Sequence, residues 1–136
     1  MFMNTQDKGD LSRLMIAGRL MKRGYKLAEP IGENHRFDLI FYDAKTSFKT
    51  VQCKTGRFVN GAVCVPLYSV VRNSTTGKAE KRSYRGQIDF ICAYCSETDT
   101  CYMVPEVGLG TREVVLRVSP PKVPSPNIRW AKEYVL

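Results

Sequence analysis

Near the N-terminus, apolar residues recur at intervals of three and four, the spacing that places side chains on one side of an α-helix. The segment 22–24 that follows supplies two cations and a glycine, which are typical of a helix C-terminus. We therefore predict a helix whose apolar stripe packs on a sheet. The stripe consists of Leu11, Leu14, Met15, Gly18 and Met21.

The rest of the chain alternates short apolar runs with turn-forming residues, which predicts β-strands. The polar stretch 43–47 separates two such runs, so we expect them to pair as an antiparallel hairpin. A helix that packs on strands indicates an α/β or α+β fold. The expected strands are 25–28, 37–42, 51–54, 58–66 with a tight turn at Asn60-Gly61, 87–95, 100–105 and an edge strand at 113–118.

The length of 136 residues suits one domain, and we assign 1–136 to a single unit. The segment 119–126 contains four prolines, which cannot donate to a β-ladder. We therefore expect 119–136 to form an extended C-terminal arm.

Three polar residues interrupt the two runs of the predicted hairpin. Because side chains alternate along a strand, Asp38 shares a face with Ile40, and Gln52 shares a face with Lys54. One pocket could therefore hold all three polar groups. Hairpins with an acid and a lysine on the solvent face are also common without catalytic function, so this spacing alone leaves both interpretations open.

The chemistry of these groups suits phosphodiester hydrolysis. A hard cation such as Mg²⁺ prefers carboxylate and other oxygen ligands together with water and substrate phosphate, and Asp38 and Gln52 could provide the protein's share. Lys54 could orient an attacking water and offset charge that develops on a phosphate.

The charge of the chain agrees with a nucleic-acid partner. Lys and Arg number 21 against 13 Asp and Glu, which gives a formal charge of +8 and a pI near 9.4. The segment 72–85 is the most unbalanced part, and we predict a basic β-ribbon or loop that contacts phosphate. Its cations are Arg72, Lys78, Lys81, Arg82 and Arg85, against the single acid Glu80.

The five cysteines are odd in number and lack the spacing of a disulfide scaffold, which favours a reducing cytoplasm. Cys92 and Cys95 form a C-x-x-C, but a separation of three within a strand sends them to opposite faces, so we expect no zinc site. The N-terminal residues show no signal-peptide pattern, and we expect a soluble cytoplasmic protein.

The segment Arg36-Phe37-Asp38-Leu39-Ile40, followed by Val51-Gln52-Cys53-Lys54-Thr55-Gly56-Arg57, resembles the core of PD-(D/E)XK nucleases. Among these, the chain is most similar to the homing endonucleases encoded in bacterial group I introns. The resemblance extends over 8–10, 22–25, 87–90 and 102–105, and thus over most of the chain. It implies a restriction-endonuclease-like core with a central mixed sheet, in which Asp38 binds metal, Gln52 replaces the usual second acid and Lys54 is the catalytic lysine.

Two positions depart from the family pattern. Gln52 offers an oxygen but no charge, although a glutamine there is similar to this branch of the family. The family helix usually carries a glutamate in a Gly-Asp-x-Gly-Glu context, where this chain has Arg13. Asp10, one helical turn earlier, could reach the same pocket or could act only as a favourable charge near the helix start.

We predict a magnesium-dependent endonuclease of double-stranded DNA, of the site-specific homing type, that works as a homo-oligomer, either a dimer or a tetramer. Asp38, Gln52 and the backbone carbonyl of Cys53 would hold Mg²⁺, for which Mn²⁺ could substitute, with Asp10 as a further acid. Arg13, Arg57 and the basic segment would bind DNA. The alternatives are a junction-resolving or repair nuclease of the same fold, or a DNA-binding module that has lost hydrolysis.

Overall fold

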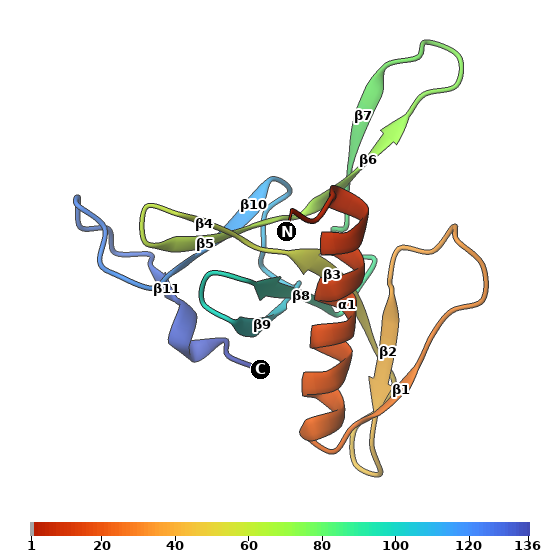
Figure 1. Ribbon diagram of the computed structural model, residues 1–136, viewed down its shortest axis with the longest axis horizontal. Coiled ribbons are helices and arrows are strands. Elements are labelled where there is room, and N and C mark those ends of the chain that lie inside the picture. The colour runs from red at the N-terminus through yellow and green to blue at the C-terminus, as the bar shows by residue number, and fades with distance from the viewer. Residues whose placement is uncertain (1) are drawn as a thin grey trace.

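The computed structural model describes residues 2–136, which form one helix packed on a five-stranded sheet, a second sheet of four strands, and a separate two-stranded ribbon (Figure 1). The α+β class predicted from the sequence is therefore confirmed. The elements are α1 (Thr5–Lys22), β1 (Lys26–Ala28), β2 (Leu39–Tyr42), β3 (Lys49–Thr55), β4 (Arg57–Val59), β5 (Ala62–Pro66), β6 (Tyr68–Arg72), β7 (Ala79–Ser83), β8 (Phe90–Cys95), β9 (Thr100–Pro105), β10 (Glu113–Arg117), β11 (Arg129–Trp130) and the 3₁₀ helix η1 (Ala131–Glu133).

Helix α1 begins at a side-chain cap and ends before a glycine. The Asn4 side chain accepts a hydrogen bond of 2.8 Å from the N–H of Asp7, which satisfies one of the free donors of the first turn. The chain leaves the helix through Gly24, whose φ of 93° is readily accessible only to glycine.

The helix buries only part of the predicted stripe. Its fully buried residues are Ser12, Ile16 and Leu20, and Leu11 and Met15 of the predicted stripe pack beside them, whereas Leu14 and Met21 are 66% and 64% exposed. The prediction was thus correct for Leu11 and Met15 and wrong for Leu14 and Met21, because Ser12 belongs to the packed face. Its hydroxyl forms a hydrogen bond of 2.7 Å with the hydroxyl of Thr55 on β3, and this bond allows a polar residue to be buried there.

The first sheet has the strand order β1-β2-β3-β8-β9, and α1 packs on one of its faces. Strands β2 and β3 form the predicted antiparallel hairpin, with Leu39 opposite Val51. Strand β8 runs parallel to β3, while the other neighbours in this sheet are antiparallel. The sheet is thus mixed, as the resemblance implied.

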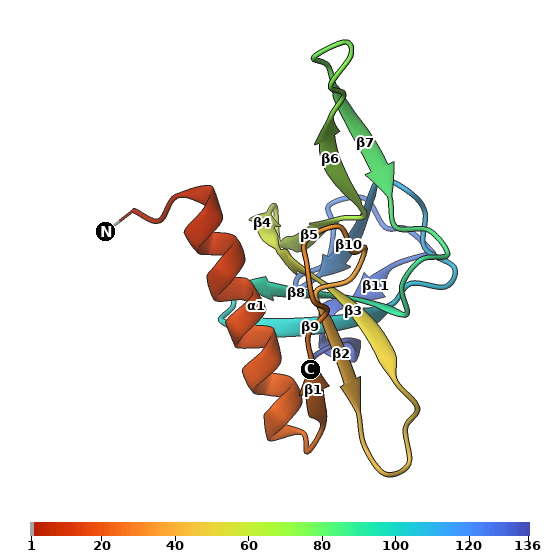
Figure 2. The ribbon, with the colours of Figure 1, turned by 90° about the vertical axis from the view of Figure 1, so that its right-hand side faces the viewer.

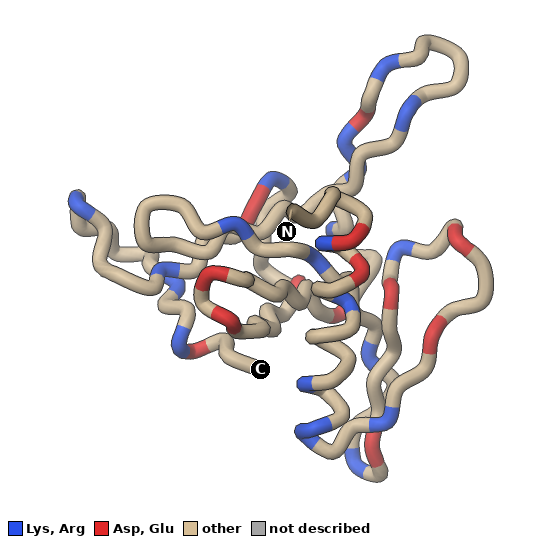
Figure 3. Tube along the Cα trace, in the orientation of Figure 1, with Lys and Arg blue, Asp and Glu red and all other residues tan. Residues whose placement is uncertain are grey.

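The ribbon of β6 and β7 projects from the body as a separate pair of strands (Figures 1 and 2). Both strands of the ribbon carry Lys or Arg residues (Figure 3). The acid Glu80 lies on β7, between Lys78 and Lys81 in the sequence. The basic segment predicted as a ribbon or loop is therefore a ribbon, and its tip is closed by Asn73, whose side chain accepts hydrogen bonds from Thr75 N–H and Thr76 N–H.

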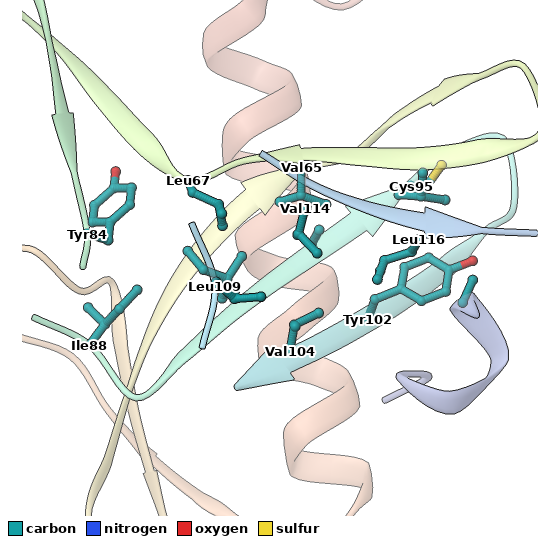
Figure 4. Packing of buried hydrophobic residues seen from close by; sticks show 14 residues of the cluster. Val65, Leu67, Tyr84, Ile88, Cys95, Tyr102, Val104, Leu109, Val114 and Leu116 are labelled. Atoms are coloured by element: carbon teal, nitrogen blue, oxygen red, sulfur yellow. The ribbon is translucent and has the colours of Figure 1, made fainter. Parts of the chain in front are cut away.

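The second sheet, in the order β11-β10-β5-β4, packs against the other face of the first sheet and encloses a core that the sequence did not predict (Figure 4). Gly56 joins the two sheets: its N–H donates to the carbonyl of Tyr94 at 2.8 Å, and a Cβ there would lie 2.8 Å from Val63. The predicted turn at Asn60-Gly61 is confirmed, with φ of 48° and 78°.

The segment 113–118 was predicted to be an edge strand, and this prediction was wrong. Strand β10 lies between β5 and β11, because Leu116 and Arg117 pair in parallel with Arg129 and Trp130. The C-terminal residues then pack on the body, where the N–H of Leu136 donates to the carbonyl of Cys101 at 2.9 Å. The segment 119–128 contains no strand.

Cys92 lies in the core under α1, and Cys95 lies in the core between the sheets, so the two residues point to opposite faces as expected. No helix in the described residues 2–136 combines the length and the apolar composition that crossing a membrane requires.

The buried face of α1 can be tested with two identical substitutions. Leu20→Ala removes a fully buried side chain and should lower the free energy of unfolding by about 2–5 kcal/mol. Leu14→Ala on the exposed face should change it by less than about 0.5 kcal/mol. Urea titrations followed by circular dichroism measure both values, and equal losses would contradict this placement of the helix.

Candidate active site

Asp38 is held against β3 by two hydrogen bonds. It directly precedes β2, and its N–H donates to the carbonyl of Val51 at 2.8 Å. Its Oδ2 accepts from the N–H of Cys53 at 3.1 Å. The carboxylate is thus fixed beside the middle of β3, while the side chain remains half-buried rather than enclosed.

Gln52 and Lys54 lie on the face of β3 that points away from α1. In the parallel pairing with β8 they stand beside Ile91 and Ala93, whose side chains belong to the core between the two sheets. The same face is therefore apolar on β8 and polar on β3. Both polar residues are half-buried, and so they lie at the margin of that core.

The three groups predicted to hold metal lie together around Cys53. Asp38 accepts from the N–H of Cys53, and the side-chain amide of Gln52 donates to the carbonyl of Cys53 at 3.4 Å. The available donors are one carboxylate, one amide oxygen and one backbone carbonyl, which are the oxygen ligands that Mg²⁺ and Mn²⁺ accept. Within residues 2–136 no cluster of three or more His, Cys, Asp or Glu side chains could hold a metal, so a cation here would depend on the neutral oxygens.

The thiol of Cys53 points to the helix side and is not a candidate ligand. Burial and the negative charge of Asp38 raise its pKa far above the ordinary value, and the opposing effect of Arg13 is smaller. The thiol therefore stays protonated at neutral pH, which leaves the backbone carbonyl as the group that Cys53 can offer.

Lys54 is bound by backbone and aromatic groups rather than by an acid. Its Nζ donates to the carbonyl of Tyr68 at 2.9 Å and lies 4.9 Å from the centroid of the Tyr84 ring. An ammonium group has three N–H donors, so this arrangement leaves capacity for a water or a phosphate oxygen.

A pocket of about 230 Å³ opens beside Asp38. Arg13 of α1 lines it together with Asp38, so the residue in place of the family glutamate does reach the neighbourhood of the acid. Asp10 does not line this pocket; it is exposed and accepts a hydrogen bond of 3.3 Å from Gln6. The other lining residues are Glu29, Pro30, Gly32, Glu33, His35 and Phe37.

The cations predicted to bind DNA lie at the surface. Arg57 begins β4 and forms an exposed ion pair of 3.8 Å with Glu113, which is the one salt bridge among residues 2–136. Arg13 and the ribbon cations are also exposed. The ribbon residues in question are Arg72, Lys78, Lys81, Arg82 and Arg85.

Two residues of this region carried no signal that sequence reasoning recognised as functional. Tyr84 contacts Lys54, and Arg36 contacts Tyr84. Tyr84 lies within the basic segment 72–85 but carries no charge there, and Arg36 lies outside that segment. Glu29 and Glu33, which line the pocket with Asp38, belong to no motif in the sequence. Their place beside Asp38 follows from the path of the loop between β1 and β2.

A family model for PD-(D/E)XK endonucleases matches residues 3–136. The chain belongs to the PD-(D/E)XK endonuclease family. Among solved structures, this endonuclease is similar to the bacterial homing endonuclease I-Ssp6803I, with a TM-score of 0.75 and 24% sequence identity over 98% of this chain and 89% of that chain. At this identity the likeness establishes the fold. A search of curated protein sequences finds no match.

These comparisons confirm the predicted family, the fold and the assignment as an endonuclease. The individual roles of Asp38, Gln52, Lys54 and Asp10 remain predictions, which the geometry above makes testable.

The role of Asp38 can be separated from its structural hydrogen bond. Asp38→Asn keeps an oxygen that can accept from the N–H of Cys53 but removes the charge, so the melting temperature should stay within about 3 °C while the affinity for Mn²⁺ falls by about tenfold or more. Isothermal titration calorimetry measures the affinity.

Asp89→Asn is the matched control. Asp89 also accepts hydrogen bonds from β3, at Thr50, yet it is not one of the predicted ligands. The Asp89→Asn variant should bind Mn²⁺ with the affinity of the wild type. If Asp38→Asn also retains wild-type affinity, Asp38 is not a ligand.

Proposed function

We propose that this endonuclease hydrolyses phosphodiester bonds of double-stranded DNA in a Mg²⁺-dependent reaction, and that it is a site-specific homing enzyme. The observation that carries the proposal is the arrangement around Cys53, whose N–H donates to Asp38 and whose carbonyl accepts from Gln52. Lys54 lies on the same face of β3 as Gln52. The structural likeness to a homing endonuclease supports the finer assignment.

In this site Asp38, Gln52 and the carbonyl of Cys53 would hold the ion. When bound, Mg²⁺ supplies Lewis acidity toward the phosphate and lowers the pKa of a coordinated water, and Mn²⁺ can substitute for it. Lys54 uses the N–H donors that Tyr68 leaves free to orient the attacking water and to offset charge on the phosphate. Asp10, exposed on α1, is a candidate for contact with water around the ion.

In this proposal, surface cations outside this site bind the DNA phosphates. Arg13 lies beside Asp38, where it is placed to contact a phosphate near the scissile bond. Arg57 and the β6–β7 ribbon extend the contact along the duplex, and a two-stranded ribbon fits the major groove. Because one site cuts one strand, we propose a homo-oligomer, a dimer or tetramer, that places two sites on opposite strands.

The five free cysteines agree with a reducing compartment, and we propose the cytoplasm. A DNA-binding module without hydrolysis is the second candidate function. It is favoured by Gln52 in place of an acid and by Arg13 in place of the family glutamate. A junction-resolving or repair nuclease of this fold would be distinguished by preference for a four-way junction over a linear duplex.

Hydrolysis can be tested on supercoiled plasmid. We expect nicking or linearisation with Mg²⁺ or Mn²⁺ and none with a chelator. Lys54→Ala should lower the rate by about a hundredfold or more while DNA affinity changes little, because the lysine acts on the developing charge rather than on binding. The absence of metal-dependent cutting by the wild type, with salt-sensitive binding retained, would favour the binding module.

Contacts between the ribbon cations and DNA phosphates can be tested through the salt dependence of binding. Lys81→Gln should weaken binding to all duplexes alike and reduce the slope of log K against log salt concentration by about 0.9, the value expected for one lost phosphate contact. Lys122→Gln, an exposed lysine outside the ribbon, serves as the control and should leave the slope unchanged. Fluorescence anisotropy over a series of KCl concentrations, from about 50 to about 300 mM, measures both slopes. Equal slopes for wild type and Lys81→Gln would exclude this contact.

A further inference from the structure

The end of the β6–β7 ribbon that joins the body, here called its foot, consists of Tyr68, Ser69, Arg82, Ser83 and Tyr84. Arg36 connects this foot to the segment that carries Asp38. It lies two residues before Asp38 and is half-buried. Its guanidinium stacks on the ring of Tyr84, with Cζ 4.2 Å from the centroid. It also donates hydrogen bonds to Ser69 Oγ at 2.8 Å, Arg82 O at 3.1 Å, Ser83 O at 2.7 Å and Gln87 Oε1 at 2.6 Å. Both ribbon strands are therefore held at their base by one side chain.

Lys54 contacts the same foot. Tyr68, whose carbonyl accepts from Lys54 Nζ, is the first residue of β6, and Tyr84 directly follows β7. The Tyr84 ring thus faces two cations, Arg36 and Lys54. It is 4% exposed, lies at one end of the core next to Leu67 and Ile88 (Figure 4), and its N–H donates to the carbonyl of Leu67 at 3.2 Å.

The position of this foot fixes the direction of the lysine. One of the three N–H donors of Lys54 is used on Tyr68, so the directions of the other two depend on where that carbonyl and the Tyr84 ring lie. The ribbon itself pairs with no strand of the other sheets within residues 2–136, and an isolated pair of strands is held only weakly by its own contacts. Its orientation therefore depends on the foot.

We propose that Tyr84 is a positioning residue for Lys54, and that Arg36 and Tyr84 couple the seating of the β6–β7 ribbon on DNA to the orientation of the lysine. A duplex on which the ribbon seats poorly is then bound but cut slowly. The coupling adds specificity to the cleavage step, beyond the specificity of binding. It rests on the proposed function, since it concerns the same lysine and the same DNA.

A purely structural role for Arg36 and Tyr84 predicts a different result. Loss of structural support would lower stability or DNA affinity and leave the cutting rate of the bound complex unchanged. Loss of coupling lowers the rate at saturating DNA while affinity is retained. The measurement that separates the two is single-turnover cleavage with enzyme in excess, together with the dissociation constant for DNA measured in chelator and the melting temperature.

The variants are Tyr84→Phe, Tyr84→Leu and Arg36→Met. Tyr84→Phe keeps the aromatic face and should cut as the wild type does. Tyr84→Leu and Arg36→Met should each lower the single-turnover rate by about tenfold, the effect expected from losing a buried cation–π contact together with precise orientation, with DNA affinity within about twofold.

Arg117→Met is the matched control. Arg117 also donates to backbone carbonyls, those of Asn60 and Ser119, but it does so at the β4–β5 turn and makes no contact with the ribbon foot. Its removal deletes the same charge together with hydrogen bonds to two backbone carbonyls, as Arg36→Met does at Arg82 and Ser83. The rate should stay at the wild-type value.

A spectroscopic measurement reports on the lysine without cutting. The ε-methylene protons of Lys54 lie near the Tyr84 ring and should show a ring-current shift that is kept in Tyr84→Phe, reduced in Arg36→Met and changed when a target duplex is added in chelator. The proposed coupling is wrong if the ring-current shift stays the same when the duplex is added. It is also wrong if Arg36→Met cuts at the wild-type rate.

The outcomes separate the coupling from the proposed function. A wild type that cuts, with Tyr84→Leu and Arg36→Met equally fast, overturns the coupling alone. A wild type that never cuts overturns both. If Tyr84→Leu fails to fold, the comparison of Arg36→Met with Arg117→Met decides the question.

Discussion

The register between β2 and β3 is the constraint on which the candidate site depends. Leu39 stands opposite Val51, and both side chains enter the core beneath α1. Since side chains alternate along a strand, this pairing sends Gln52 and Lys54 to the other face and brings the N–H of Cys53 to Asp38. A slip of one residue would exchange the two faces, burying Gln52 and Lys54 under the helix and separating Asp38 from its partner.

The helix reinforces this register from one side, and the second sheet bounds the site on the other. The hydrogen bond between Ser12 and Thr55 joins α1 to the last residue of β3. Because Thr55 directly follows Lys54, this bond fixes the backbone next to the lysine. On the opposite face, Ile91 and Ala93 of β8 are sealed by the second sheet, while β3 lies at the margin of that core. A half-buried margin provides both the fixed geometry and the solvent access that hydrolysis needs.

The elements that could be predicted from the sequence are those set by local patterns. The β2–β3 hairpin and the Asn60-Gly61 turn follow from alternation and turn chemistry, and the charge imbalance of 72–85 indicated an exposed basic ribbon or loop. The family resemblance named Asp38, Gln52 and Lys54 as a group. Leu14 and Met21 were predicted to be buried but are exposed, because they are as apolar as Leu11 and Met15, which do pack on the core.

Other features depend on contacts between segments that are distant in the chain. Strand β10 is internal only because the two-residue strand β11 pairs with it. The hydrogen bonds of Arg36 reach residues 69–87, and no local pattern reveals that a loop arginine will meet them. The second sheet likewise forms from strands separated by the whole ribbon and by β8 and β9.

The charge of the proposed site explains why DNA and metal should act together there. Among the three predicted ligands, Asp38 is the one carboxylate and Gln52 is neutral, while the cation Arg13 and the acids Glu29 and Glu33 line the adjoining pocket. A divalent ion bound by so little negative charge keeps a net positive charge, which the phosphates of DNA can neutralise as additional ligands. The protein alone would therefore hold such an ion weakly, and the coordination shell would be complete only with substrate in place. The same logic would apply to Lys54 in the proposed mechanism, where the N–H donors that Tyr68 leaves free would exchange solvent for a phosphate oxygen and the attacking water. A site that is assembled by its substrate would suit the proposed site-specific endonuclease, which would bind many DNA segments and cut few.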